Sequence, residues 1–314
     1  MHRVGYLITE GFQVMSLATQ SVFEFANLVA GEPVYRVQNF SVGGGTVRSS
    51  LGLCIDTQPL EAAGLADTWM VVGTLTPLTP ASEEVLNSVR GFMQQARRVA
   101  GVCTGGFILA AAGALDRRRA TTHWSFARAM RERYPQVAVE DDRIFIVDGP
   151  VWTSAGMTAA LDMALGMVEK DLGADLARSV AHRLVMHQRR SGGQSQHSEL
   201  LTLSAKSDRI QSALEYARQH LSLPLSVEEL AEVAHLSPRQ FTRVFTAETG
   251  QPPAKAIEKL RLEGARLMIE QTRHSLEEVA RQNGFRDRRH MREVFMRGFG
   301  VAPAAIRRDA RRVS

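Results

Sequence analysis

Residues 226–231 read S-V-E-E-L-A, and residues 275–280 read S-L-E-E-V-A. The two copies lie 49 positions apart, and each is followed by residues that also repeat. At an offset of 50, the matching residues are Phe245 and Phe295, Gly250 and Gly300, and Pro253 and Pro303. An internal repeat of this length indicates two copies of one supersecondary unit.

Each copy has the signals of a helix-turn-helix unit. A serine is followed three residues later by a glutamate, which predicts capping boxes at 226–229 and 275–278. In the second copy, Gly284 is suited to the left-handed backbone of a tight turn between helices. In the first copy, Ser237 is a predicted N-cap and Pro238 takes the first helical position. The sequence therefore predicts two short helix pairs.

The second helix of each pair is predicted to be amphipathic and basic. Its buried face would hold Phe241, Val244 and Phe245 in the first copy, and Met291, Val294 and Phe295 in the second. Its exposed face would carry Arg239, Thr242 and Arg243, and then Arg288, Arg289, His290 and Arg292. Such side chains are suited to base edges and phosphates in the major groove. Glu293 either accepts a hydrogen bond from a cytosine or pairs with Arg289 or Arg297.

A long amphipathic helix is predicted between the two copies. Its inward residues would be Ile257, Leu260, Leu267 and Met268. A rod of this kind would hold the two recognition helices about one turn of DNA apart, roughly 34 Å. Residues 207–308 resemble the DNA-binding domain of the AraC/XylS family, including R-V-F-T-A-E-T-G and the closing F-G-V-A-P. That resemblance implies base contacts from the exposed residues named above.

Charge is distributed unevenly along the chain. The net charge is +5, but from residue 205 onward there are 20 Lys and Arg against 14 Asp and Glu. A basic end on a nearly neutral body favours a polyanionic partner. No run of 18 apolar residues is present, so we expect no membrane span. The sequence carries only two cysteines, which disfavours a disulfide framework and favours a reducing, cytoplasmic setting.

The first 170 residues alternate between strand-like and helix-like segments. Strands are predicted at Arg3–Thr9, Val34–Phe40, Trp69–Gly73, Arg98–Val102 and Arg143–Val147. Helices are predicted at Leu17–Val29, Ser82–Gln95, Gly105–Ala112, Ser125–Arg133, Ala155–Glu169 and Ala174–Gln188. Such alternation predicts a doubly wound, flavodoxin-like α/β domain with a mostly parallel sheet. Residues 189–198, R-R-S-G-G-Q-S-Q-H-S, have the composition of a linker.

Cys103 is predicted to lie on a sharp turn between a strand and a helix. The segment G-V-C-T-G-G resembles a nucleophile elbow, and His123 follows 20 residues later in A-T-T-H-W. A thiol at a helix N-terminus would have its thiolate favoured by the helix dipole. With V-W-T-S-A-G-M-T-A-A-L-D-M-A-L and G-Q-S-Q, these motifs resemble the ThiJ/PfpI class, and in particular GlxA-type regulators that fuse this domain to an AraC/XylS module.

Three positions depart from the enzymes of that class. Ser16 stands where the enzymes carry a carboxylate, Thr104 replaces the histidine that often follows the cysteine, and Thr74 replaces a glycine. The chain therefore retains the framework of a pocket without a plausible acid–base partner, and we expect no enzymatic activity. Two alternatives remain: a thiol-based redox or electrophile sensor through Cys103, and a ThiJ/PfpI-type hydrolase with a DNA-binding tail.

The predicted pocket is built around the cysteine. Its residues would be Cys103, Thr104, His123, Trp124, Ser16, Thr74 and Trp152, although core packing is an equally natural role for the tryptophans. Cys54 lies in an apolar run and is expected in the core. No cofactor or metal is expected.

The predicted organisation is a ligand-sensing and dimerising domain at 1–188, a linker at 189–206 and an all-α DNA-binding domain with two helix-turn-helix units at 207–314. The resemblance implies a homodimer that binds duplex operator DNA and acts with RNA polymerase. It also implies a small effector, an amine or a metabolite related to amino acids, and activation of metabolic genes.

Overall fold

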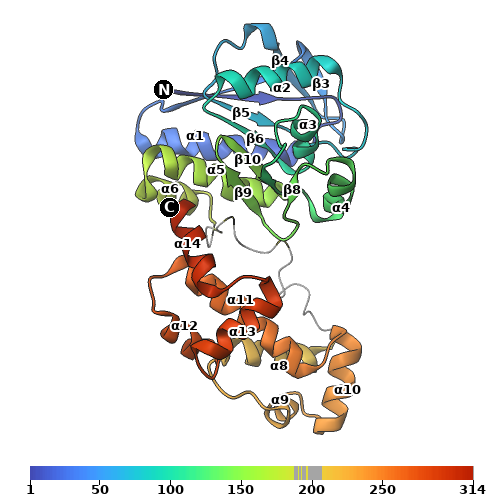
Figure 1. Ribbon diagram of the computed structural model, residues 1–314, viewed down its shortest axis with the longest axis vertical. Helices are drawn as coiled ribbons and strands as arrows, with labels where there is room; N and C mark the ends of the chain where they lie inside the picture. Colours follow the sequence, from blue (N-terminus) through green and yellow to red (C-terminus); the bar gives the residue numbers. More distant parts are fainter. Residues whose placement is uncertain (187–189, 191, 193–195, 197–206, 314) are drawn as a thin grey trace. The chain divides into compact units, whose positions relative to one another are not determined.

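The computed structural model describes residues 1–186, 190, 192, 196 and 207–313 (Figure 1). They form two compact units, residues 1–196 and 197–312. Each unit is described by itself. None of the described helices is long and apolar enough to cross a membrane.

The first unit is built on an eight-stranded sheet with the order β3-β4-β2-β1-β5-β6-β10-β9. All neighbouring strands are parallel except for the two outer pairs, β3 with β4 and β10 with β9. The strands are β1 (His2–Leu7), β2 (Tyr35–Ser41), β3 (Gly43–Arg48), β4 (Cys54–Pro59), β5 (Thr68–Val71), β6 (Arg98–Gly101), β9 (Phe145–Asp148) and β10 (Val151–Ser154), with a separate short pair, β7 (Arg119–Ala120) and β8 (Ala138–Val139).

Helices cover both faces of this sheet (Figure 1). Alternate residues of β1 belong to different cores, because Val4 and Tyr6 pack with α1, α5 and α6, whereas Leu7 packs with α2 and α3. The predicted doubly wound α/β fold is therefore confirmed. The helices of this unit are α1 (Thr19–Ala30), α2 (Glu83–Gln95), α3 (Gly106–Ala111), α4 (Trp124–Arg133), α5 (Met157–Leu172) and α6 (Ala174–Arg183), with short 3-10 turns η1 (Val14–Ala18), η2 (Leu60–Ala62) and η3 (Cys103–Gly105).

Several sequence predictions for this unit need correction. The hairpin of β3 and β4 was missed because β3 begins with three glycines and carries little apolar pattern. Cys54 is exposed at the start of β4, opposite Arg48 at the end of β3, and so does not lie in the core. Helix α6 ends at Arg183, short of the predicted Gln188. The predicted linker began at residue 189, but Arg190 and Gln196 form hydrogen bonds to the first unit.

The second unit is entirely helical among its described residues. Its two apolar cores are joined by the long helix α11, which places Ile257 and Leu260 in the first core and Ala265 and Ile269 in the second. Leu267 was predicted to face inward, and this prediction was wrong. The buried apolar side chains of α11 near this point are those of Ala265 and Ile269, and Leu267 is half-buried outside both cores. The helices are α8 (Asp208–Gln219), α9 (Val227–Val233), α10 (Pro238–Thr249), α11 (Pro253–Gln271), α12 (Leu276–Gln282), α13 (Arg288–Phe299) and α14 (Pro303–Val313).

The two helix-turn-helix units differ in their turns. The residue with left-handed backbone is His235 in the first, at φ 53°, and Gly284 in the second, at φ 67°. A methyl group added at Gly284 would collide with the carbonyl oxygen of Leu221, so this turn requires glycine for space as well as for conformation. The role predicted for Gly284 is confirmed.

The N-terminal caps are formed differently from the prediction. Ser226 and Ser275 do accept hydrogen bonds from the backbone of Glu229 and Glu278. Neither glutamate returns the bond, because Glu229 accepts from the Tyr216 hydroxyl and Glu278 pairs with an arginine. The capping box instead occurs at the recognition helix α10, between Ser237 and Gln240.

Candidate DNA interface and effector site

The recognition helix α10 presents a free basic face. Phe241 and Phe245 are buried against the first core, as predicted, and this leaves Arg239, Thr242 and Arg243 exposed on the opposite side. These three residues line a shallow groove together with Thr246 and Ala247. Among the described residues, neither Arg239 nor Arg243 has an ion-pair partner, so both guanidinium groups are available for an external anion or base.

The corresponding face of α13 is also basic, but two of its arginines form ion pairs with glutamates. Arg288 pairs with Glu277 at 3.4 Å, and Arg289 pairs with Glu293 at 3.2 Å. Of the alternatives for Glu293, the structure therefore shows the pair with Arg289. Arg292 is exposed. A ligand that recruits Arg288 or Arg289 must compete with an existing carboxylate.

His290 lies differently from its predicted place on the open face. The side chain is half-buried, with its ring edge-on to Phe285 at 5.8 Å between centroids. Its Nδ1 accepts a hydrogen bond from the backbone of Arg286 at 3.4 Å. His290 thus contributes to the turn before α13, and its predicted base contact stays untested.

In the first unit, Cys103 occupies the predicted elbow between β6 and α3. Its backbone is left-handed, at φ 54°, which is unusual for a residue other than glycine. Space at this turn is tight, because a methyl group on Gly105 would collide with the carbonyl oxygen of Val71. The turn is therefore held against the end of the neighbouring strand β5.

The thiol of Cys103 is buried. Its residue is 2% exposed, and burial raises the pKa of the thiol to about 11, although hydrogen bonds from Thr104 oppose part of that rise. The sequence-based expectation of a favoured thiolate is therefore wrong, because burial disfavours the charged form of the thiol. No carboxylate of the described residues forms a hydrogen bond with Cys103.

Four of the other predicted pocket residues come from η1, from the start of α4 and from β10. Ser16 is fully buried, and its hydroxyl has no hydrogen-bond partner among the described residues. His123 caps α4, with its Nδ1 2.7 Å from the hydroxyl of Ser125. Trp124 is 53% exposed, whereas Trp152 is buried in the core within cation–π distance of Arg98 and Lys170. Trp152 therefore belongs to the core, and a role for either tryptophan beside the cysteine stays a prediction.

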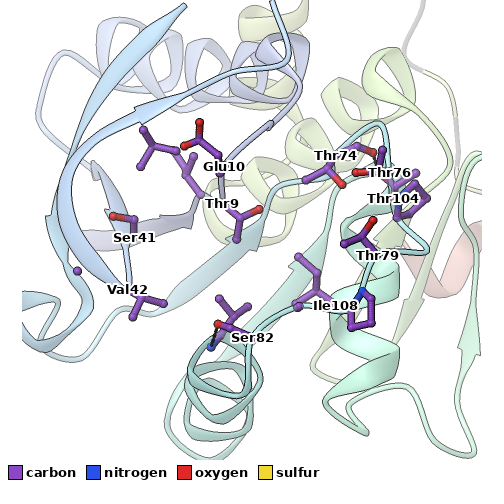
Figure 2. A pocket seen from close by; sticks show the side chains of 17 residues that line it. Thr9, Glu10, Ser41, Val42, Thr74, Thr76, Thr79, Ser82, Thr104 and Ile108 are labelled. Carbon is purple, nitrogen blue, oxygen red and sulfur yellow. Dashed lines mark hydrogen bonds between the residues drawn. The ribbon is translucent and has the colours of Figure 1, made fainter. Parts of the chain in front are cut away.

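A cavity of about 440 Å³ lies at the carboxyl end of the sheet, where doubly wound folds bind ligands (Figure 2). Of the predicted pocket residues, only Thr74 and Thr104 line it, and Thr104 donates to the carbonyl of Thr74 at 2.7 Å. Hydroxyl groups dominate its polar lining, and its single charged residue is Glu10. The hydroxyl-bearing residues are Thr9, Ser41, Thr74, Thr76, Thr79, Ser82 and Thr104.

Sequence reasoning missed most of this cavity. Glu10 follows β1, Ser41 ends β2, and Thr76 and Thr79 lie in the loop between β5 and α2. The available signal was that each of these polar residues lies at the carboxyl end of a strand or in the loop that follows it. Parallel neighbours bring such positions to one edge of the sheet.

The buried thiol leads to a prediction about alkylation. Iodoacetamide at pH 8 should modify Cys103 about a hundredfold more slowly than a thiol of ordinary pKa, because only the thiolate attacks. The rate should then rise about tenfold per pH unit toward pH 11. Peptide mass spectrometry would follow both cysteines, with the exposed Cys54 as the internal control. Equal modification of the two residues at pH 8 would contradict the burial of Cys103.

Comparison with known proteins identifies both units. Residues 7–170 match the DJ-1/PfpI family, and residues 230–309 match a helix-turn-helix domain. The chain is 32% identical to the HTH-type transcriptional regulator GlxA of Rhizobium meliloti, over 98% of this chain and 96% of that protein. It is also 36% identical to an isonitrile hydratase of Pseudomonas putida, but over only 44% of this chain and 60% of the hydratase.

A solved structure shows the same fold in the first unit. The crystal structure of an AraC family transcriptional regulator from Pseudomonas putida superposes with a TM-score of 0.54 and 26% identity, covering 59% of this chain and all of that one. The match to GlxA, by contrast, extends through both units. The chain therefore belongs to the DJ-1/PfpI family and, over its whole length, to the helix-turn-helix transcription regulators that join such a domain to an AraC-type DNA-binding domain.

Proposed function

We propose that this regulator responds to a small effector, binds its operator as a homodimer through α10 and α13, and activates metabolic genes through RNA polymerase. The observation that carries the DNA-binding part is the exposed face of α10, where Arg239 and Arg243 have no ion-pair partner within the described residues. An arginine held in this way can bind guanine with two hydrogen bonds. The more neutralised α13 would contribute less to affinity.

We further propose that the first unit senses and does not catalyse. A cysteine nucleophile needs a lowered pKa or an adjacent base. Cys103 has a raised pKa, and no described carboxylate or imidazole forms a hydrogen bond with its thiol. The same burial weighs against a rapid redox sensor. The isonitrile hydratase shows that a related domain supports catalysis elsewhere, so the absence of activity here stays a proposal.

The cavity is the proposed effector site. Its volume of about 440 Å³ lies in the range of small-molecule pockets, and it combines hydroxyl groups with the apolar side chains of Ile8, Val42, Val47 and Ile108. Glu10 accepts one hydrogen bond from the backbone of Arg48, which leaves capacity for a cation. A small ammonium compound is therefore favoured over a carboxylate or phosphate.

The first test is specific DNA binding by the full-length protein. Arg243→Ala should weaken binding to an operator recovered by genomic selection by about 1–3 kcal/mol, because a bidentate base contact is lost. Arg289→Ala should cost less, since this guanidinium already pairs with Glu293. Fluorescence anisotropy would measure both affinities.

Arg178→Ala is the control for the change in charge, because Arg178 lies exposed on α6 of the first unit. It should bind the operator as the wild type does. If Arg243→Ala lowers the affinity for the operator and for random DNA by the same factor, recognition of a base by Arg243 would be contradicted. Failure of genomic selection to enrich any motif would contradict the proposed function itself.

The second test concerns the charge of the effector. Three probes of matched size carry different charges: 4-amino-1-butanol, 1,4-butanediol and 4-hydroxybutyrate. Isothermal titration calorimetry of the full-length protein should rank the cation first and the anion last. Glu10→Gln should weaken binding of the cation about tenfold, because a direct charge pair near the surface is removed.

Glu32→Gln is the matched control, because Glu32 is exposed and does not line the cavity. It should leave the ranking unchanged. Binding of the anion as tight as that of the cation would contradict the proposed chemistry, as would an unchanged preference in Glu10→Gln.

A further inference from the structure

Gln196 is held by the first unit through its side-chain amide. Its Oε1 accepts from the backbone N–H of Trp124 at 2.9 Å. Its Nε2 lies within 3.1 Å of three acceptors: the Thr121 hydroxyl, the Thr122 carbonyl and the Arg143 carbonyl. Both ends of one amide are therefore used, and an apolar or acidic side chain could not replace them.

The residues that hold Gln196 also contact the elbow. Thr122 is fully buried, and its hydroxyl donates to the carbonyl of Cys103 at 3.2 Å. The backbone N–H of Cys103 in turn lies 3.4 Å from the hydroxyl of Ser154 on β10. Two consecutive hydrogen bonds thus connect the elbow to Gln196, through a single residue that both share.

A second attachment lies six residues earlier in the sequence. The backbone N–H and the Nε of Arg190 donate to the two carboxylate oxygens of Asp162 on α5, each at 2.8 Å. The Asp162 side chain has no exposed area. A buried carboxylate paired in this way strongly resists loss of its partner. Arg190 is therefore held through a buried charge, whereas Gln196 is held by neutral hydrogen bonds alone.

The position of Gln196 in the sequence means that its release would lengthen the connection to the DNA-binding unit. Met1–Gln196 belong to the first unit. Ten residues separate Gln196 from Ser207, which is the first described residue of the second unit. If Gln196 is released while Arg190 stays bound, the connection between the units gains six residues. The length of a connection sets the effective concentration of a tethered domain at its site.

We propose that Gln196 transmits the state of the Cys103 elbow to the DNA-binding unit, by binding to or releasing from the Thr121–Trp124 segment. This inference rests on the proposed function, because it describes how occupancy of the first unit reaches DNA. Thr104 lines the cavity and follows Cys103 directly, so a ligand there can shift the elbow. The shift passes through Thr122 to Gln196.

A double-mutant cycle tests this transmission in the full-length protein. Thr122→Val keeps the size of the side chain and removes its hydrogen bond to Cys103. Gln196→Ala removes the attachment itself. If Gln196 transmits the state of the elbow, Thr122→Val should change operator affinity at least about fivefold in the wild-type background, which is the low end of ordinary allosteric coupling. The same substitution should have less than about a twofold effect in Gln196→Ala.

Hydrogen exchange supplies a local readout of the attachment. The Trp124 amide donates to Gln196, so its exchange should accelerate about tenfold or more in Thr122→Val and reach its limit in Gln196→Ala. Gln38→Ala is the matched control, because Gln38 forms an exposed amide–amide hydrogen bond with Gln58 on the same sheet. It should change neither readout.

The outcomes separate this inference from the proposed function. An equal effect of Thr122→Val in both backgrounds, or no effect in the wild type, overturns transmission through Gln196 while operator binding remains intact. Unchanged Trp124 exchange in Gln196→Ala overturns the attachment itself. Loss of specific binding in the wild type would instead contradict the proposed function.

Discussion

The first unit depends on the constrained turn at Cys103. Its left-handed backbone, at φ 54°, and the close approach of Gly105 to Val71 bring four chain segments into contact. Thr104 reaches the loop after β5, while the Cys103 backbone meets β10 and the segment before α4. In α/β-hydrolases a strained strand-to-helix turn of this kind presents a nucleophile. Here the thiol is buried, burial raises its pKa, and the backbone of the turn forms hydrogen bonds to neighbouring elements.

The DNA-binding unit depends on a different constraint, because the single helix α11 contributes side chains to both of its apolar cores. Helix α11 packs into the first core near its start and into the second near its end. Both helix-turn-helix units thus pack against the same helix. Their recognition helices differ in how many of their exposed arginines form ion pairs. Within the described residues, Arg239 and Arg243 of α10 have no ion-pair partner, whereas Arg288 and Arg289 of α13 each pair with a glutamate.

Local features could be predicted from the sequence, whereas features built from distant segments could not. The repeat, the recognition helices, Gly284 and the elbow all depend on short motifs, and the structure contains each of them. The cavity joins Glu10, Ser41 and Thr104, which only the parallel sheet brings together. Proximity in sequence to His123 or to β10 does not fix a side chain's direction, so the sequence alone could not decide which tryptophan packs into the core. Gln196 lay in a segment with the composition of a linker, and composition does not reveal that one amide there finds four partners.

We propose that occupancy of the first unit controls DNA binding by the second. Operator affinity of the full-length protein, with and without the metabolite that most raises its melting temperature, tests this most directly. The account predicts a 5- to 150-fold change for the full-length chain, as expected for a coupling of about 1–3 kcal/mol. It predicts no change for residues 207–313 alone. Unchanged affinity of the full-length protein at saturation, or an equal change in the isolated fragment, would contradict it.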